Sequence, residues 1–246
     1  MIDSNIKAVM MVHYFGQPQD IKKFQTLCNK HKILLIEDNA HGFGGNYNGN
    51  ELGTYGDIGI SSPRKTINIA SGGVLWQKGN NLNDDITIPS FSPSILNYLN
   101  IIISNNYPSI KSILKKILQN RPKYEDYKLF REGIINDYTI DSRSKKVLQK
   151  LNIENVIKHR QKGYHQWYNF ALENNLTPVF SKLHKEASPW CFPAFVKNHD
   201  ESTKWFDWGW ENNVHVFSWP SLPEAALQKN KELMDRWEKL VCFEIK

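Results

Sequence analysis

The sequence has little cysteine and no long apolar run. Its three cysteines, Cys28, Cys191 and Cys242, are far apart, and no two of them have the spacing CxxC. An odd and dispersed set supports neither a disulfide framework nor a zinc knuckle, so a reducing cytoplasm is expected. No stretch approaches the roughly 20 apolar residues that span a bilayer, and the N-terminus lacks the basic and apolar parts of a secretory signal. We therefore expect a cytoplasmic protein without a membrane segment.

Clustered positive charge is also absent. The 31 Lys and Arg residues exceed the 25 Asp and Glu residues and give a net charge of +6, but both signs are interleaved along the chain. This pattern predicts no nucleic-acid partner. With 246 residues, 40% of them hydrophobic and 23% charged, the chain is also far from the composition of disordered proteins. Its length fits one large domain, or one domain with a small appendage.

The first third of the chain alternates between strand-like and helix-like patterns. Two apolar runs of strand length, residues 7–15 and 33–36, flank a stretch with helical periodicity that follows Asp20, the expected N-cap. The apolar residues on one face of this helix are Ile21, Phe24, Leu27 and Cys28. Such a β-α-β unit indicates an α/β fold with a parallel sheet, whose ligands bind outside the carboxyl ends of the strands. Turn signals then precede two more short strands, at residues 58–61 and 74–76.

The rest of the chain changes character twice. Residues 94–175 have helical spacing, both at Ile110, Ile113, Leu114 and Ile117 and in a capped stretch from Asp141 to Asn174. Beyond Pro178, two strand-like runs at 190–196 and 214–217 alternate with helix-like runs at 201–212 and 223–240. We therefore expect three parts: 1–93 in a ligand-binding large domain, 94–175 as connecting helices, and 176–246 as a small α+β lobe. Trp205, Trp208 and Trp210, together with Trp237, Leu240 and Val241 at the end, are interpreted as packing residues of that lobe.

Two side chains suggest a specific chemistry. Asp38 follows an apolar strand, and Lys65 lies shortly before the turn at Gly72 and Gly73. Pyridoxal phosphate (PLP) requires a lysine that forms an imine with its aldehyde and a carboxylate that keeps its pyridine nitrogen protonated. The alternatives are a solvated loop lysine and an aspartate that caps a helix. His13 and Tyr14 end the first strand on the ligand side and receive no role.

Four blocks in order, residues 8–20, 34–45, 52–66 and 71–76, closely resemble the DegT/DnrJ/EryC1/StrS family of PLP-dependent sugar aminotransferases. The resemblance implies the type I, aspartate aminotransferase-like fold. It is weaker around Arg160 and in residues 192–196 and 219–223, which look like the C-terminal part of the family.

The resemblance also implies roles for individual residues. Lys65 would be the Schiff-base lysine, Asp38 the partner of the pyridine nitrogen, and His41 the neighbour of the cofactor ring or its phenolic oxygen. For His41 a purely structural histidine remains the alternative. Either Ser61 or Ser62 would bind the cofactor phosphate. The choice between them stays open, because the chain is two residues shorter before the lysine than is common in the family.

The implied function is transfer of an amino group from glutamate or glutamine to a nucleotide-linked keto-sugar, by a homodimer. Lys65 disfavours the family's dehydratases, which typically have histidine there. The resemblance starts almost at Met1, so the family's N-terminal segment, with a phosphate-binding loop, is expected to be missing and the large domain incomplete. The alternative is therefore a catalytically incomplete remnant or a partner subunit. Such a chain is expected to be oligomeric or poorly soluble alone, because apolar surface is left uncovered.

Overall fold

The computed structural model describes residues 3, 5–79, 89–107, 109–110, 113, 117, 138–219 and 231–245. The chain divides into two compact units. The first comprises Met1–Ile101, Asp137–Gln161 and Leu183–Trp190, and the second comprises Ile102–Asn136, Lys162–Lys182 and Cys191–Lys246. Among the helices in the described part of the chain, none is long and apolar enough to cross a membrane.

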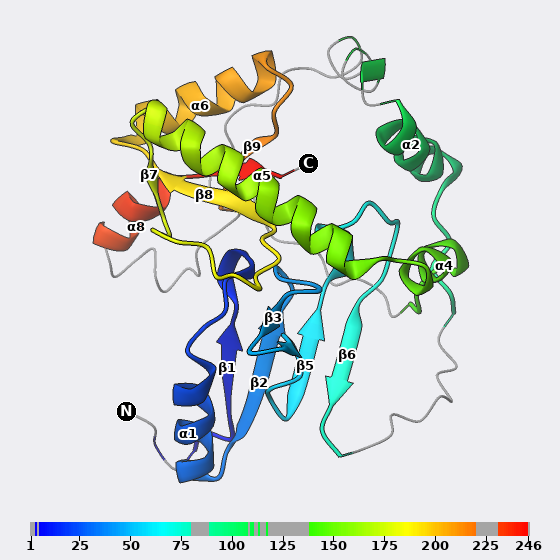
Figure 1. Ribbon diagram of the computed structural model, residues 1–246, viewed down its shortest axis with the longest axis vertical. Helices are drawn as coiled ribbons and strands as arrows, with labels where there is room; N and C mark the ends of the chain where they lie inside the picture. The colour runs from blue at the N-terminus through cyan, green and yellow to red at the C-terminus, as the bar shows by residue number, and fades with distance from the viewer. Residues whose placement is uncertain are drawn as a thin grey trace. The chain divides into compact units, whose positions relative to one another are not determined.

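A four-stranded sheet forms the centre of the first unit (Figure 1). Its strands are β1 (Ala8–Val12), β2 (Leu34–Asn39), β5 (Ile58–Ser61) and β6 (Val74–Gln77), in the order β1-β2-β5-β6. β1, β2 and β5 are parallel, as predicted, but β6 is antiparallel to β5, so the expectation of a parallel sheet is wrong for this strand. A parallel neighbour needs a long crossover, usually a helix. The short connection from β5 to β6 contains only the 3-10 turn η2 (Pro63–Lys65) and a reversal at Gly72, where φ is +133°.

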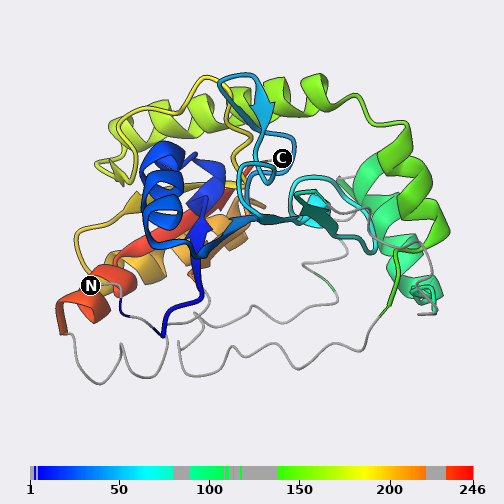
Figure 2. The same ribbon diagram turned by 90° about the horizontal axis from the view of Figure 1, so that it is seen from below.

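The helix α1 (Ile21–His31) covers one face of this sheet. Its N-cap is Asp20, as predicted, whose side chain accepts a hydrogen bond from the Lys23 N–H at 3.2 Å. The core between helix and sheet consists of Met11, Ile21, Cys28, Leu35 and Leu52. The short hairpin of β3 (Asn46–Tyr47) and β4 (Asn50–Glu51) lies on the same side of the sheet as α1 (Figure 2).

Two strand boundaries differ from the expectation, and both differences shape the site. β1 ends at Val12 rather than at residue 15, because the 3-10 turn η1 (Tyr14–Gly16) follows, with φ of 59° at Phe15 and 82° at Gly16. A Cβ at Gly16 would lie 2.5 Å from the carbonyl oxygen of Ser188, so only glycine fits there. β2 continues to Asn39, which places Glu37 and Asp38 inside the strand.

Helices account for most of the described residues between 95 and 173. These are α2 (Ile95–Asn106), α4 (Ser142–Gln149) and α5 (Ile153–Glu173), the last of which continues from the first unit into the second. Asp141 caps α4 by accepting hydrogen bonds from the N–H groups of Arg143 and Ser144. Of the apolar residues expected on one helix face, Ile110, Ile113 and Ile117 are exposed, and Leu114 lies outside the described residues.

The second unit has its own sheet, in the order β7-β8-β10-β9 and with antiparallel pairs. Its elements are β7 (Thr177–Pro178), β8 (Cys191–Phe195), α6 (His199–Glu211), β9 (Val216–Ser218), α8 (Lys231–Glu238) and β10 (Leu240–Glu244).

The predicted final helix at 223–240 is wrong at its end. α8 stops at Glu238, and Leu240 and Val241 belong to β10, which pairs with both β8 and β9. This pairing buries an apolar run that a helix would expose in part. Residues 223–230 lie outside the described part. The interpretation of the tryptophans as packing residues is confirmed for Trp205 and Trp208, whose rings contact Phe170 at centroid distances of 5.7 and 5.3 Å.

Candidate functional site

The predicted site residues lie at or just beyond one edge of the first sheet. Because β1, β2 and β5 are parallel, their carboxyl ends lie at the same edge, with Val12 beside Asp38 and Asn39 beside Ser61. His41 follows β2 directly, and Ser62 and Lys65 follow β5. This is where open α/β sheets bind their ligands.

Trp190 brings Lys65 and His41 together. The Lys65 Nζ lies 5.1 Å from the centroid of the Trp190 ring, a cation–π distance. The imidazole of His41 stacks on the same indole, at 4.7 Å between centroids and 25° between planes. Burial, together with the positive charge of Lys65, lowers the pKa of His41 to about 3. His41 is therefore neutral at physiological pH.

The hydrogen bond of His41 also fixes which nitrogen carries its proton. Its Nδ1 accepts from the backbone N–H of Phe15 at 3.3 Å, so in the neutral ring the hydrogen is on Nε2. The Phe15 ring lies 6.4 Å from the imidazole, at 30° between planes. His41 is thus held as a neutral donor.

Backbone contacts hold Trp190 in place. Its N–H donates to the Phe15 carbonyl at 3.2 Å, and its own carbonyl accepts from Nη2 of the buried Arg160. Arg160 Nε donates to the preceding carbonyl, that of Pro189, at 2.9 Å. Trp190 was expected within a strand, but β8 begins only at Cys191. No sequence pattern predicts that Trp190 lies close to Lys65. The most closely related sequence feature is Arg160, which resembles the family and contacts the Trp190 carbonyl.

Asp38 is at the same edge and is half-buried. Its Oδ1 accepts from the Ala40 N–H at 2.8 Å, and its carbonyl accepts from the His13 N–H at 2.9 Å. Asp38 therefore caps a turn, not the helix that the alternative interpretation assumed, because no helix follows β2 here. Its side chain is on the face of the sheet opposite to that of Glu37, since neighbouring residues of a strand alternate.

The two candidate serines differ in their surroundings. Ser61 is buried, and its hydroxyl accepts from the side-chain amide of Asn39 at 3.3 Å. Ser62 is half-buried, precedes η2, and accepts the Lys65 N–H through its carbonyl at 3.1 Å. Ser62 is the more accessible of the two, and the role of either in phosphate binding stays a prediction.

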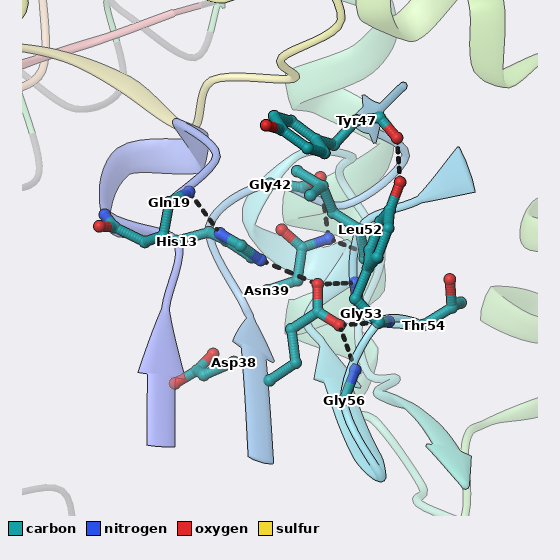
Figure 3. Close-up of polar contacts among 12 residues, drawn as sticks. His13, Gln19, Asp38, Asn39, Gly42, Tyr47, Leu52, Gly53, Thr54 and Gly56 are labelled. Carbon is teal, nitrogen blue, oxygen red and sulfur yellow. Dashed lines mark hydrogen bonds and ion pairs between the residues drawn. The ribbon is translucent and has the colours of Figure 1, made fainter. Parts of the chain in front are cut away.

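A buried polar network lies beside these residues (Figure 3). Glu37 and His13 are both 0% exposed and are joined by a hydrogen bond of 2.8 Å. Sequence reasoning gave His13 no role and did not select Glu37, because a glutamate before an aspartate at a strand end carries no distinctive pattern.

Comparison with solved structures defines the class of this fold. PseC of Helicobacter pylori, an aminotransferase involved in the biosynthesis of pseudoaminic acid, superposes with a TM-score of 0.59 and 15% identity, over 99% of this chain and 62% of that chain. The Escherichia coli GDP-4-keto-6-deoxy-D-mannose-3-dehydratase with bound hydrated PLP gives 0.57 and 14%, over 99% and 64%. The predicted type I fold of PLP-dependent aminotransferases is thus confirmed.

Sequence comparison gives a match to one family over part of the chain. The model of the DegT/DnrJ/EryC1/StrS aminotransferase family matches residues 1–95. GDP-perosamine synthase of Vibrio cholerae is 42% identical over 89 residues, which are 35% of this chain and 23% of that protein. The UDP-N-acetyl-3-dehydro-alpha-D-glucosamine 3-aminotransferase of Acidithiobacillus ferrooxidans is 38% identical over 74 residues, 29% of this chain and 20% of that protein. The match thus spans less than a quarter of these curated relatives.

Proposed function

We propose that this chain contributes the lysine-bearing part of a PLP-dependent aminotransferase that acts on a nucleotide-linked keto-sugar. The observation that carries the proposal is the placement of the Lys65 amine beside His41 and Trp190, at the strand edge that also holds Asp38. A cytoplasmic homodimer is part of the same proposal.

The residues at this edge fit PLP. The cofactor presents an aldehyde, a basic ring nitrogen and an oxygen anion, and it supplies a ring that draws electrons from a bound amine. Lys65 offers the amine, Asp38 a carboxylate, and His41 a neutral N–H donor. Trp190 and Phe15 offer aromatic surface next to His41. The set thus offers a partner for each of these three groups.

Each residue would have a distinct task. Lys65 would bind the aldehyde and, when released, move a proton at its Nζ. Asp38 would hold a proton on the ring nitrogen, because a carboxylate at hydrogen-bond distance favours the charged form of its partner. His41 would donate from Nε2 to an oxygen of the ligand without competing for its proton, since a base with a pKa of about 3 stays neutral.

The substrate class is supported by the names of the relatives. GDP-perosamine synthase and the UDP-sugar 3-aminotransferase both point to sugars linked to a nucleotide. An L-glutamine:2-deoxy-scyllo-inosose aminotransferase of Streptomyces kanamyceticus, 32% identical over 66 residues, supports glutamine as an amino donor, with glutamate as the other candidate.

Reductive trapping tests the proposal. PLP and borohydride added to the protein should give a covalent adduct that mass spectrometry maps to the peptide containing Lys65. Lys65→Ala should abolish it, whereas Lys78→Ala, at an exposed lysine beyond the site, should not. An adduct on another lysine, or one that survives Lys65→Ala, would overturn the assignment.

The second candidate is a partner subunit or a remnant of such an enzyme, without turnover of its own; this chain spans 62% and 64% of two solved neighbours. The two candidates differ in the first half of the reaction. An aminotransferase should convert bound PLP to pyridoxamine phosphate when L-glutamate or L-glutamine is added, which chromatography of the released cofactor detects. Trapping at Lys65 without this conversion would favour the partner subunit.

A further inference from the structure

Glu37 has the most complete set of partners among the carboxylates described at this edge. Its Oε1 accepts from the Gly53 N–H at 2.7 Å and from His13 Nε2 at 2.8 Å. Its Oε2 accepts from the N–H groups of Tyr55 at 2.6 Å and Gly56 at 3.0 Å. A carboxylate has about four acceptor sites, so all of them are filled. Glu37 therefore has no capacity left to bind a ligand.

His13 is bound on both ring nitrogens. Its Nδ1 accepts from the Gln19 N–H at 3.0 Å, so Nε2 carries the hydrogen and donates to Glu37. Figure 3 shows the dashed contact between Gln19 and the His13 ring. His13 thus connects the segment before α1 to the carboxylate on β2.

Glu37 is ionised although it is buried. Burial by itself would raise its pKa, but the hydrogen bonds from His13, Gly53 and Tyr55 outweigh burial and leave the pKa below its usual value. The N–H donors of the 53–56 loop thus stabilise the buried carboxylate of Glu37, and the same hydrogen bonds attach the loop to β2.

The 53–56 loop in turn packs against β5. A Cβ at Gly59, in β5, would lie 1.6 Å from the Gly53 carbonyl oxygen, so loop and strand approach as closely as their backbones allow. Asn39, the next inward residue of β2 after Glu37, donates to the carbonyls of Leu52 at 2.9 Å and Gly42 at 3.1 Å. Together with the pairing of β2 and β5, the loop therefore helps to fix where β5 lies, and β5 leads through Ser62 into the turn η2 that contains Lys65.

We infer that Glu37 is a positioning residue for Lys65. It acts through the 53–56 loop and β5 and, with His13, holds the carboxyl ends of β1, β2 and β5 together so that the lysine amine stays beside the Trp190 ring. This role of Glu37 concerns the same site, and it rests on the proposed function only in that Lys65 is taken as the residue that binds the cofactor.

The test reads the position of Lys65 without any cofactor. Reductive methylation with ¹³C-formaldehyde labels the lysines and preserves their charge, and the Trp190 ring current should displace the Lys65 resonance from those of exposed lysines. The Lys65→Arg variant assigns that resonance by its loss. In Glu37→Gln the resonance should move back toward the exposed lysines. In the matched control Glu51→Gln, at an exposed glutamate of the neighbouring hairpin, it should not move.

Amide exchange provides the second readout. In Glu37→Gln the amides of Gly53, Tyr55 and Gly56 should exchange at least about tenfold faster, because the glutamine NH₂ group would face two of the four donors instead of accepting from them. His13→Phe removes one of the partners of Glu37 and should give a smaller change in the same direction. If Glu37→Gln does not fold, the His13→Phe variant decides.

Three results would overturn the inference: unchanged exchange of the loop amides, faster exchange with an unmoved Lys65 resonance, or a wild-type Lys65 resonance without a ring-current shift. Failure of the proposed function gives a different pattern. In that case the Lys65 resonance responds to Glu37→Gln, but PLP and borohydride leave no adduct on wild-type Lys65.

Discussion

The two faces of the first sheet differ in an unusual way. The face under α1 contains the buried apolar residues Met11 and Leu35, but also the charged Glu37. On the opposite face, Met10 is 55% exposed and Leu75 is 53% exposed. Strand residues alternate between faces, so Met10 and Met11, or Glu37 and Asp38, are neighbours in sequence with opposite environments.

The difference shows that burial in this sheet follows hydrogen-bond supply as much as hydrophobicity. Glu37 is buried because backbone N–H groups and His13 saturate it. Among the described residues, the apolar side chains of the opposite face have no comparable cover; they include Met10, Leu34, Ile60 and Leu75. Parallel strands usually have both faces covered, so this face is a candidate for contact with further polypeptide.

The largest difference between the two faces of the first sheet should appear when a lysine is introduced on each of them. Met11→Lys would bury an ammonium in a packed core and should cost about 3–5 kcal/mol of unfolding free energy. Met10→Lys, one residue away, should cost less than about 0.5 kcal/mol, because its side chain is exposed. Urea denaturation of both variants measures the difference. Equal losses would mean that the faces are not distinct.

The pair Glu37 and Asp38 sharpens the comparison with polar residues. Glu37→Gln should lower the unfolding free energy by about 2–3 kcal/mol, because two buried donors lose their acceptor. Asp38→Asn should cost less than about 1 kcal/mol. Under the proposed function it should also leave trapping at Lys65 nearly intact and severely reduce turnover, because the ring nitrogen of PLP would lose its charged partner. Denaturation, trapping and turnover separate a structural role of Glu37 from a cofactor-binding role of Asp38. A Glu37→Gln variant as stable as wild type would contradict the structural role of Glu37.

The pH dependence of Glu37 has a defined sign. Because its folded pKa is lowered from the ordinary 4.5, its stabilisation is complete above that value and is lost as the pH falls through the folded pKa. Wild type should therefore lose more stability below pH 4.5 than Glu37→Gln does. Denaturation midpoints at acidic pH measure this, and parallel curves for the two proteins would rule it out.

His41 should add a separate pH dependence at higher pH. Its pKa falls from 6.5 to about 3 on folding, so the unfolded chain binds the extra proton between these values and stability rises with pH there. Between pH 6.5 and 4.5 the contribution is about 2 kcal/mol, from 1.36 kcal/mol for each pH unit. The comparison is with His41→Phe, which should lack this loss. Equal pH dependence in both would contradict a neutral, buried His41.

The sequence predicted local features better than long-range ones. Asp20 as the cap of α1 and the strand at 58–61 follow from residue types within a few positions, and the structure confirms both. The reversal of β6 and the strand β10 depend on which partner lies alongside, and no local pattern encodes that.

The same distinction applies to the site. Lys65 and His41 were found because family motifs carry them, whereas Trp190 lies far along the chain and meets them only through the fold. Glu37 could not be predicted for a further reason. Its partners are mostly backbone N–H groups, which nearly every residue type provides, so the sequence does not reveal them.

Substitutions on the sheet face opposite α1 should have the smallest effect on stability. They should change self-association instead. Exposed apolar side chains on one face promote self-association, so the wild-type chain expressed alone should be oligomeric or poorly soluble. The double variant with Met10→Lys and Leu75→Lys should shift the chain toward the monomer in sedimentation velocity, because like charges would oppose each other across the contact. Its unfolding free energy should change by less than about 1 kcal/mol, since both side chains are exposed.

The control is a second double variant, Lys22→Glu with Lys30→Glu. Both lysines are exposed on α1, so the variant changes the charge of the protein away from this face and should leave association unchanged. A monomeric wild type, or a double variant that associates as strongly as wild type, would show that this face is not the contact surface.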